Sequence, residues 1–298
     1  MTDDEIGRLY ALLRVPSVSA LPQHADDMLR CAHLVADEIR RADGAADVRT
    51  GTARPLVLGD VPASTGAGAP RVIVYGHYDV QPIGDLGLWH SNPFEPEVRD
   101  GNLYARGASD DKGNLFMLLV AVQRLATAGV LPVNVTFLVD GEEEVSGDSA
   151  LDWVRDAAPD AAAALIFDIA MAGPGRPVIC SGLRGLVYRR VTVTTAPGDA
   201  HSGLFGGAAL NAAHALVRIL DAIRPHSGRL DPRLYAGAIA ATPDEVAAWA
   251  DLPPGGEVLA DAGLVPADGD AADAFYRRTL TEPSGCTVLR LPSFPSTV

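Results

Sequence analysis

Four clusters of acidic and imidazole side chains in this sequence have the composition of a metal site. Each cluster directly follows or directly precedes an apolar run: the clusters are His77 with Asp79, Asp110 with Asp111, Glu142 to Glu144, and Asp168. Uncompensated charges beside apolar segments are costly. A bound cation would compensate them, and a mixture of histidine and carboxylate ligands suits zinc.

The apolar runs beside these clusters predict the elements that position them. Residues 71–75, 133–139 and 164–167 are short apolar runs typical of buried strands, and residues 114–127 form a strongly apolar helical pattern. Strands that alternate with helices indicate an α/β fold with a largely parallel sheet. Two amphipathic helices are expected earlier in the chain, at residues 5–13 and 26–41.

The carboxyl ends of parallel strands are where ligands gather in such sheets. Each cluster alone has an ordinary explanation, because His-x-Asp often forms a turn, two aspartates often cap a helix, and a glutamate run is usually a solvated loop. These explanations do not account for the placement of several clusters at successive strand ends. We therefore expect His77, Asp110, Glu144 and Asp168 to converge on one rim of the sheet.

The composition excludes several classes of protein. The net charge of −14 argues against nucleic acid or anionic membranes as partners, and the 48% of hydrophobic residues excludes global disorder. The three cysteines, Cys31, Cys180 and Cys286, are widely spaced, which favours a reducing compartment over a disulfide framework. Residues 1–14 lack the pattern of a signal peptide, and no stretch approaches a membrane span. We therefore expect a soluble cytoplasmic protein.

The pattern changes after Gly185. Residues 187–195 alternate as a strand with one wet face does, and residues 208–223 predict a helix. Beyond Pro225 the chain is rich in Ala, Pro, Asp and Gly, and its elements are not predicted. We divide the chain into a first domain of residues 1–185 and a second of residues 186–298.

Several short motifs follow one another in a characteristic order between about residue 5 and residue 225. They are Tyr75-Gly-His-Tyr-Asp-Val-Gln-Pro82, Trp89 with Pro93-Phe94, Leu103-Tyr-Ala-Arg-Gly107, Asp110-Asp-Lys-Gly113, Gly141-Glu-Glu-Glu144, Gly182-Leu-Arg-Gly185, Asp199-Ala-His-Ser-Gly203 and Phe205-Gly-Gly207. In order and spacing they resemble the M20 metallopeptidase family, especially its carnosinase-like dipeptidase and carboxypeptidase branch.

The resemblance implies a zinc-peptidase-like catalytic domain with a mostly parallel central sheet, followed by the start of an inserted α+β lid or dimerisation domain. It also implies hydrolysis of dipeptides or short peptides by a metal-activated water, with two Zn²⁺ ions in a complete site and Mn²⁺ or Co²⁺ as alternatives. A homodimer formed through the lid domain is a further implication.

The same resemblance assigns the metal ligands. His77 and Asp168 are expected to bind one zinc ion, Glu144 the second, and Asp110 both, because each of its carboxylate oxygens can serve one ion. The peptide bond between Asp110 and Asp111 is expected to be cis.

Catalytic roles are implied for three other residues. Asp79 is expected to orient the imidazole of His77, and Glu143 to act as the general base that transfers a proton from water to the leaving amine. His201 is expected to reach across a dimer and stabilise the oxyanion in the partner's site. Asn211 is a weaker candidate for contact with the substrate.

One part of the family pattern is missing from this sequence. In the family, the catalytic domain resumes after the lid and supplies a final histidine ligand, whereas this sequence stops at Val298 in a segment that resembles the lid. We therefore expect a shortened chain. Two alternatives to the dipeptidase are an N-acyl amino acid deacylase of the same family and a non-catalytic metal-binding remnant.

Overall fold

The computed structural model describes residues 1–50, 53–66, 68–157, 160–169, 171, 175, 177–180, 189–226, 229–267 and 271–281. The chain separates into two compact units, Met1–Met171 and Ala172–Val298. The boundary predicted near Gly185 lies outside the described residues. Each unit is described by itself.

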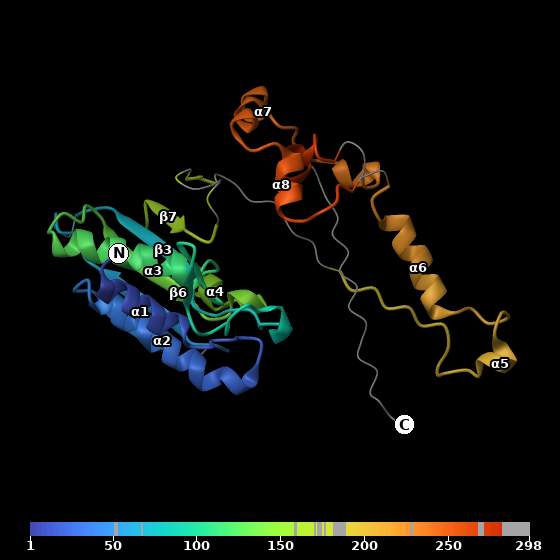
Figure 1. The fold of residues 1–298 in the computed structure, drawn as a ribbon, viewed down its shortest axis with the longest axis horizontal. Coiled ribbons are helices and arrows are strands. Elements are labelled where there is room, and N and C mark those ends of the chain that lie inside the picture. Colours follow the sequence, from blue (N-terminus) through green and yellow to red (C-terminus); the bar gives the residue numbers. More distant parts are fainter. Residues whose placement is uncertain are drawn as a thin grey trace. The chain divides into compact units, whose positions relative to one another are not determined.

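The first unit is built around a five-stranded sheet with the order β1-β2-β6-β3-β7. Figure 1 labels its strands β3, β6 and β7. The strands are β1 (Ala45–Arg49), β2 (Leu56–Val61), β3 (Arg71–His77), β6 (Asn134–Asp140) and β7 (Ala163–Ile166). The pairings of β3 with β6 and β7 are parallel, whereas β2 runs antiparallel to both β6 and β1. The α/β class and the three predicted strands are confirmed, and the sheet as a whole is mixed.

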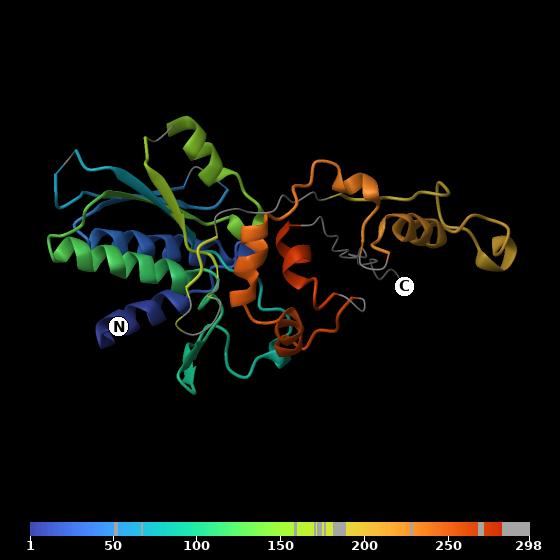
Figure 2. The ribbon, with the colours of Figure 1, turned by 90° about the horizontal axis from the view of Figure 1, so that it is seen from above.

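Helices cover both faces of this sheet. One face carries α2 (Ala25–Arg40) and α3 (Lys112–Thr127), with α1 (Asp3–Leu13) packed beside them, and α4 (Ser149–Ala157) lies on the opposite face (Figure 2). The helices α1, α2 and α3 begin and end within two residues of their predicted bounds. The start of α1 is fixed by a capping box, in which Thr2 and Glu5 each bond the other's backbone N–H.

Side chains alternate along the strands and separate the core into two layers. Val57 and Val74 pack into the layer beneath α2 and α3, whereas their neighbours Leu58 and Ile73 pack into the layer beneath α4. This alternation fixes the strand register, in which His77 at the end of β3 lies opposite Asp140 at the end of β6.

A small hairpin projects from the same unit. Its strands are β4 (Glu97–Arg99) and β5 (Asn102–Tyr104), which pair antiparallel. The two turn residues, Asp100 and Gly101, have φ values of 51° and 79°. Asp-Gly is a favoured sequence for a two-residue turn in which both φ angles are positive.

The secondary-structure elements described in the second unit are all helices. Its α-helices are α5 (Ser202–Phe205), α6 (Ala212–Ile223), α7 (Pro243–Ala248) and α8 (Gly255–Asp261). The helix predicted at 208–223 is confirmed as α6, with a later start. The strand predicted at 187–195 is wrong for residues 189–195, and residues 187 and 188 lie outside the described range. An alternating pattern forms a strand only with a ladder partner, and the described part of this unit contains none.

No helix in the described part of the chain is long and apolar enough to cross a membrane.

Candidate metal centre

His77 lies at the carboxyl end of β3, where the buried central strand meets the rim of the sheet. Its side chain is fully buried, and its Nδ1 lies 3.1 Å from the backbone oxygen of Asp79. Because a carbonyl oxygen can only accept a hydrogen bond, Nδ1 carries a proton and donates it. In the neutral imidazole the lone pair is therefore on Nε2.

Two carboxylates converge on this Nε2 atom. Asp110 Oδ1 lies 3.1 Å away and Asp168 Oδ2 lies 3.6 Å away. Asp110 precedes α3 and Asp168 follows β7, so residues far apart in the sequence meet at the rim as the strand topology predicts. Among the described residues, this is the group whose donor atoms could hold a metal ion, and these atoms lie within 4.8 Å of one another.

The buried Nε2 atom shows that a metal ion fits these three side chains. Nε2 makes no hydrogen bond of acceptable geometry, despite the two nearby carboxylates. Zinc binds His and carboxylate ligands at about 2.0–2.2 Å, so ligands of one ion lie up to roughly 4 Å apart. The distances of 3.1 and 3.6 Å from Nε2 to the two carboxylate oxygens fall within this span, and the three side chains supply the mixed imidazole and carboxylate set that zinc accepts.

The electrostatics of the site indicate an excess of negative charge. Burial alone would lower the pKa of His77, but the hydrogen bond to Asp79 and the charges of Asp79, Asp111 and Glu143 raise it to about 10. Without another cation, the imidazole would therefore bind a proton at neutral pH. A metal ion at Nε2 would take the place of that proton.

Asp79 connects His77 to the glutamate run. It is fully buried, and its Oδ1 lies 3.4 Å from His77 Nδ1. Its other oxygen, Oδ2, accepts a hydrogen bond of 3.1 Å from the backbone N–H of Glu144. One carboxylate therefore contacts both the imidazole and the segment that carries Glu143 and Glu144.

Glu143 and Glu144 lie on a short 3₁₀ turn, Glu143–Val145, that follows β6. Partial desolvation raises the pKa of Glu143, and the charges of Glu144, Asp168 and Asp79 act in the same direction.

Desolvation also raises the pKa of Glu144, whose Oε2 accepts a 2.8 Å hydrogen bond from Gln81 Nε2. Glu144 lies outside the three-residue group, although the charge of Asp110 acts on it.

The structure assigns a role to Asp111 that the sequence does not predict. Its buried Oδ2 accepts a 3.1 Å hydrogen bond from the backbone N–H of His77. Burial is the main cause that raises its pKa to about 7, and the charges of Asp168 and Asp110 add to it. The peptide bond between Asp110 and Asp111 is cis, as the family resemblance implies. The sequence signal for this contact is the pair of adjacent aspartates, because two neighbouring carboxylates can each contact a different group.

His201 and Asn211 lie in the second unit and are exposed. His201 Nδ1 accepts a 3.0 Å hydrogen bond from the N–H of Gly203 at the start of α5. Asn211 Oδ1 accepts from the N–H groups of Ala213 and His214 and so caps α6. Both side chains cap helices within their own unit.

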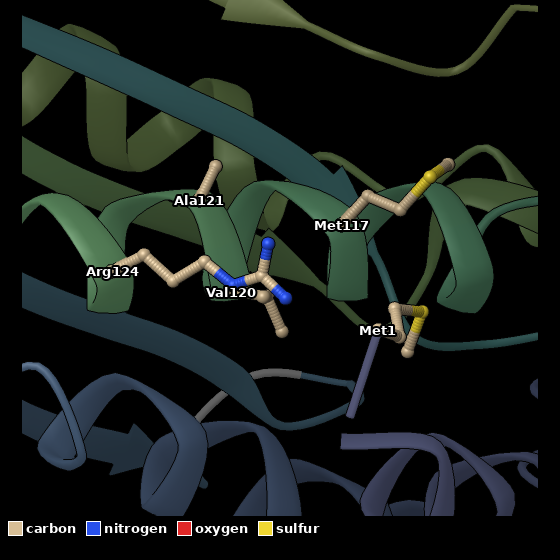
Figure 3. Close-up of a pocket in the computed structure, with 5 residues that line it drawn as sticks. All are labelled: Met1, Met117, Val120, Ala121 and Arg124. Atoms are coloured by element: carbon tan, nitrogen blue, oxygen red, sulfur yellow. The ribbon is translucent and has the colours of Figure 1, made fainter. Parts of the chain in front are cut away.

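A separate hollow on the first unit shares no residue with the metal centre. Figure 3 shows its lining: Met1, Met117, Val120, Ala121 and Arg124. The one charged side chain in this lining, Arg124, donates a 2.7 Å hydrogen bond to Glu5 Oε2. The lining therefore contains neither a metal ligand nor a catalytic acid or base.

Comparison with known proteins places these features in context. Residues 73–265 match the model of peptidase family M20/M25/M40. The cysteinylglycine-S-conjugate dipeptidase of Corynebacterium striatum is 34% identical over 233 residues, which cover 74% of this chain and 49% of that protein. The Beta-Ala-His dipeptidase of Homo sapiens is 30% identical over 255 residues, or 80% of this chain and 50% of that protein. The chain spans about half the length of the curated relatives it matches.

A solved structure shows the same fold. The M20 family metallo-carboxypeptidase Sso-CP2 from Sulfolobus solfataricus matches with a TM-score of 0.77 and 24% sequence identity. The match covers 98% of this chain and 68% of that chain.

Proposed function

The chain belongs to peptidase family M20/M25/M40, and from this premise we propose that it carries the metal-binding part of a divalent-metal-dependent dipeptidase. The observation that carries the proposal is the convergence of Asp110 and Asp168 on the buried Nε2 atom of His77. Two similar proteins are named as dipeptidases, for cysteinylglycine S-conjugates and for Beta-Ala-His. A dipeptide or short peptide is the proposed substrate.

Zinc is the proposed metal, with Mn²⁺ or Co²⁺ as alternatives. His77, Asp110 and Asp168 would hold the first ion, which three protein ligands can do. Asp110 and Glu144 would contribute to a second ion, a proposal supported by the electrostatic interaction between these two carboxylates. When bound by these residues, a divalent ion would supply Lewis-acid chemistry, polarising the scissile carbonyl and lowering the pKa of water.

Glu143 is the proposed general base. A raised pKa brings a carboxylate closer to the range in which it both accepts and returns a proton near neutral pH. Glu143 would take a proton from water as the water oxygen attacks the carbonyl carbon. It would then pass that proton to the amine nitrogen as the C–N bond breaks. Asp79 would orient the imidazole of His77, because its carboxylate lies beside Nδ1 of that ring.

His201 is proposed to stabilise the oxyanion in a homodimer formed through the second unit. The proposal rests on the family resemblance and on the exposure of His201 at the start of α5. A cytoplasmic location is proposed on the unpaired thiol of Cys31, which suits a reducing compartment. Nucleic acid and membranes are not proposed as partners, because the net charge is −14.

Zinc binding by the 298-residue chain tests the proposal. We expect one tightly bound zinc ion per chain in a competition titration against a chelator, and its loss in His77→Ala. The matched control is His33→Ala, since His33 is exposed on α2 and contacts none of these ligands. A wild-type chain that fails to bind zinc, or an equal loss in both variants, would contradict the proposal.

Hydrolysis assays distinguish the related functions. A panel of Cys-Gly, β-Ala-His and N-acetyl amino acids separates a dipeptidase from an N-acyl amino acid deacylase. A chain that binds zinc but hydrolyses neither class would be a metal-binding remnant.

A further inference from the structure

Lys112 is unusual both in the composition and in the fold. It is the one lysine among 24 Lys and Arg residues of the chain. It occupies the first position of α3, directly after Asp110 and Asp111, and its side chain is 0% exposed. No other lysine or arginine in the described part of the chain is buried.

The ammonium group of Lys112 joins the start of α3 to the end of α1. Its Nζ donates hydrogen bonds of 3.2 Å to Leu12 O and 2.7 Å to Val15 O. The last carbonyl groups of a helix lack partners within that helix and carry partial negative charge. A buried cation at this end therefore satisfies part of α1 and fixes the first turn of α3 against it.

Full burial lowers the pKa of the Lys112 ammonium, and the charge of a nearby buried acid opposes that shift. The carboxylate of Asp79, itself fully buried, interacts electrostatically with Lys112. Asp79 contacts His77 Nδ1 and the backbone of Glu144. Lys112 is thus linked to the metal centre through the chain, because it directly follows Asp110 and Asp111 at the start of α3.

The surroundings of Lys112 explain why this position is a lysine in a chain that otherwise uses arginine. The stem passes close to Gly107, where an added Cβ would lie 3.2 Å from Lys112 Cδ. An ammonium is compact and has three donors, whereas a guanidinium is planar, larger and has five. An arginine here would place unsatisfied donors in a buried site, which is costly.

We propose that Lys112 is a positioning residue for the metal centre. By tying the start of α3 to Leu12 and Val15, it holds Asp110 beside His77 Nε2 and Asp111 beside the backbone N–H of His77. This inference rests on the proposed metal-dependent function. Lys112 itself is not among the residues whose donor atoms could hold the ion.

The test compares Lys112→Arg, which keeps the charge, with Lys112→Met, which keeps much of the stem. Arg155→Met is the control, because Arg155 is exposed and forms a surface pair with Asp152. Zinc affinity is measured by chelator competition on the full chain, with near-UV circular dichroism to establish that each variant is folded. Trimethylamine N-oxide favours the folded state of weakened variants.

We expect both Lys112 variants to bind zinc about tenfold or more weakly, as changes outside the ligand set commonly do, and Arg155→Met to bind as wild type does. A merely structural role predicts lower melting temperatures with unchanged zinc affinity in the folded variants, and that result would overturn the inference. Wild-type affinity in Lys112→Arg would overturn it too. So would the failure of both variants to fold under stabilising conditions. Failure of the wild-type chain to bind zinc would instead refute the proposed function.

Discussion

His77 illustrates how neighbours decide the chemistry of one side chain. The Asp79 carbonyl keeps a proton on Nδ1, and Asp111 holds the backbone N–H of the same histidine. Asp110 and Asp168 then face the remaining nitrogen. One contact orients the ring and another holds the backbone of His77, which leaves Nε2 available to a metal ion. Metal-ligating histidines are generally held in this way through their other ring nitrogen.

Removing the charge of Glu143 should separate catalysis from metal binding. We expect Glu143→Gln to abolish peptide hydrolysis in a preparation that shows it, because the base is lost, and to retain its zinc. Asp110→Asn should lose zinc in the same titration, since one of three close donors is weakened. Substantial turnover by Glu143→Gln, or loss of its zinc, would mean that the base and ligand assignments within the glutamate run are wrong.

The titration of His77 predicts how stability depends on pH in the metal-free chain. Its pKa is about 10 in the folded state, against an ordinary value of 6.5. Folding therefore favours the protonated imidazole, and this contribution is complete below pH 6.5 and is lost as pH rises to about 10. We expect the melting temperature of the metal-free chain to fall across this window.

His77→Ala provides the control for this pH dependence. The variant should show a smaller decline over the same window, and zinc should stabilise the wild type most at the alkaline end, where no proton competes for Nε2. Equal pH slopes in wild type and His77→Ala would show that other groups cause the decline.

At the scale of elements, β3 and α3 meet with little space between them at Gly76. An added Cβ would lie 2.9 Å from Asp111 Oδ2 and 3.1 Å from Leu115 Cδ1. We expect Gly76→Ala to lower the free energy of unfolding by about 1–3 kcal/mol, a typical cost of overpacking. It should also weaken zinc binding, because Asp111 must move away from His77.

Gly7→Ala is the matched control for this crowding. Gly7 lies in the interior of α1 with nothing within 4 Å of an added Cβ. Alanine is favoured over glycine in a helix by about 1 kcal/mol, so this variant should be slightly more stable and bind zinc normally. The two variants would be compared by urea unfolding and zinc titration, and equal effects would contradict the proposed contact.

The elements that the sequence predicts well are those with long apolar patterns of their own. β3 and β6 are buried runs, and α3 is apolar over four turns, so burial alone identifies them. β1, with the sequence AADVR, has no fully buried residue, and β2 contains Gly59 and Asp60. Their strand conformation depends on pairing with β6 and with each other, which a local pattern does not show.

The site residues divide in the same way into those that have a signal in the sequence and those that have none. His77 and Asp168 follow predicted strands, Asp110 precedes a predicted helix, and the structure brings these three together. The contact of Asp111 with the backbone of His77 depends on the path of the chain into α3. The hydrogen bond from Gln81 to Glu144 likewise depends on two loops that lie 63 residues apart in the sequence. Tertiary contacts of this kind leave no periodic signal.

At the scale of the whole molecule, the two units differ in their share of the core. Apart from Ala271 and Ala274, all the buried hydrophobic residues in the described part of the chain belong to the unit Met1–Met171. The three side chains proposed as metal ligands belong to it as well. This unit therefore has the apolar core that independent folding needs.

A fragment of residues 1–171 should fold and bind zinc without the second unit. We expect cooperative thermal unfolding by circular dichroism and a zinc affinity equal to that of the full chain. An unfolded fragment would show that the remaining residues complete the core. A folded fragment with weak zinc binding would show that the second unit supplies a ligand.

The pairing of His77 with Asp140 also limits how such a protein can diverge. A single-residue insertion within β3 would exchange the side chains that face the two core layers and turn the imidazole away from its partners. Insertions in the connections before β3 and β6 leave that phase intact. A lineage can therefore vary its loops and replace core residues with others of similar size. An insertion within β3 must instead add an even number of residues, so that the core side chains and His77 keep the faces they now occupy.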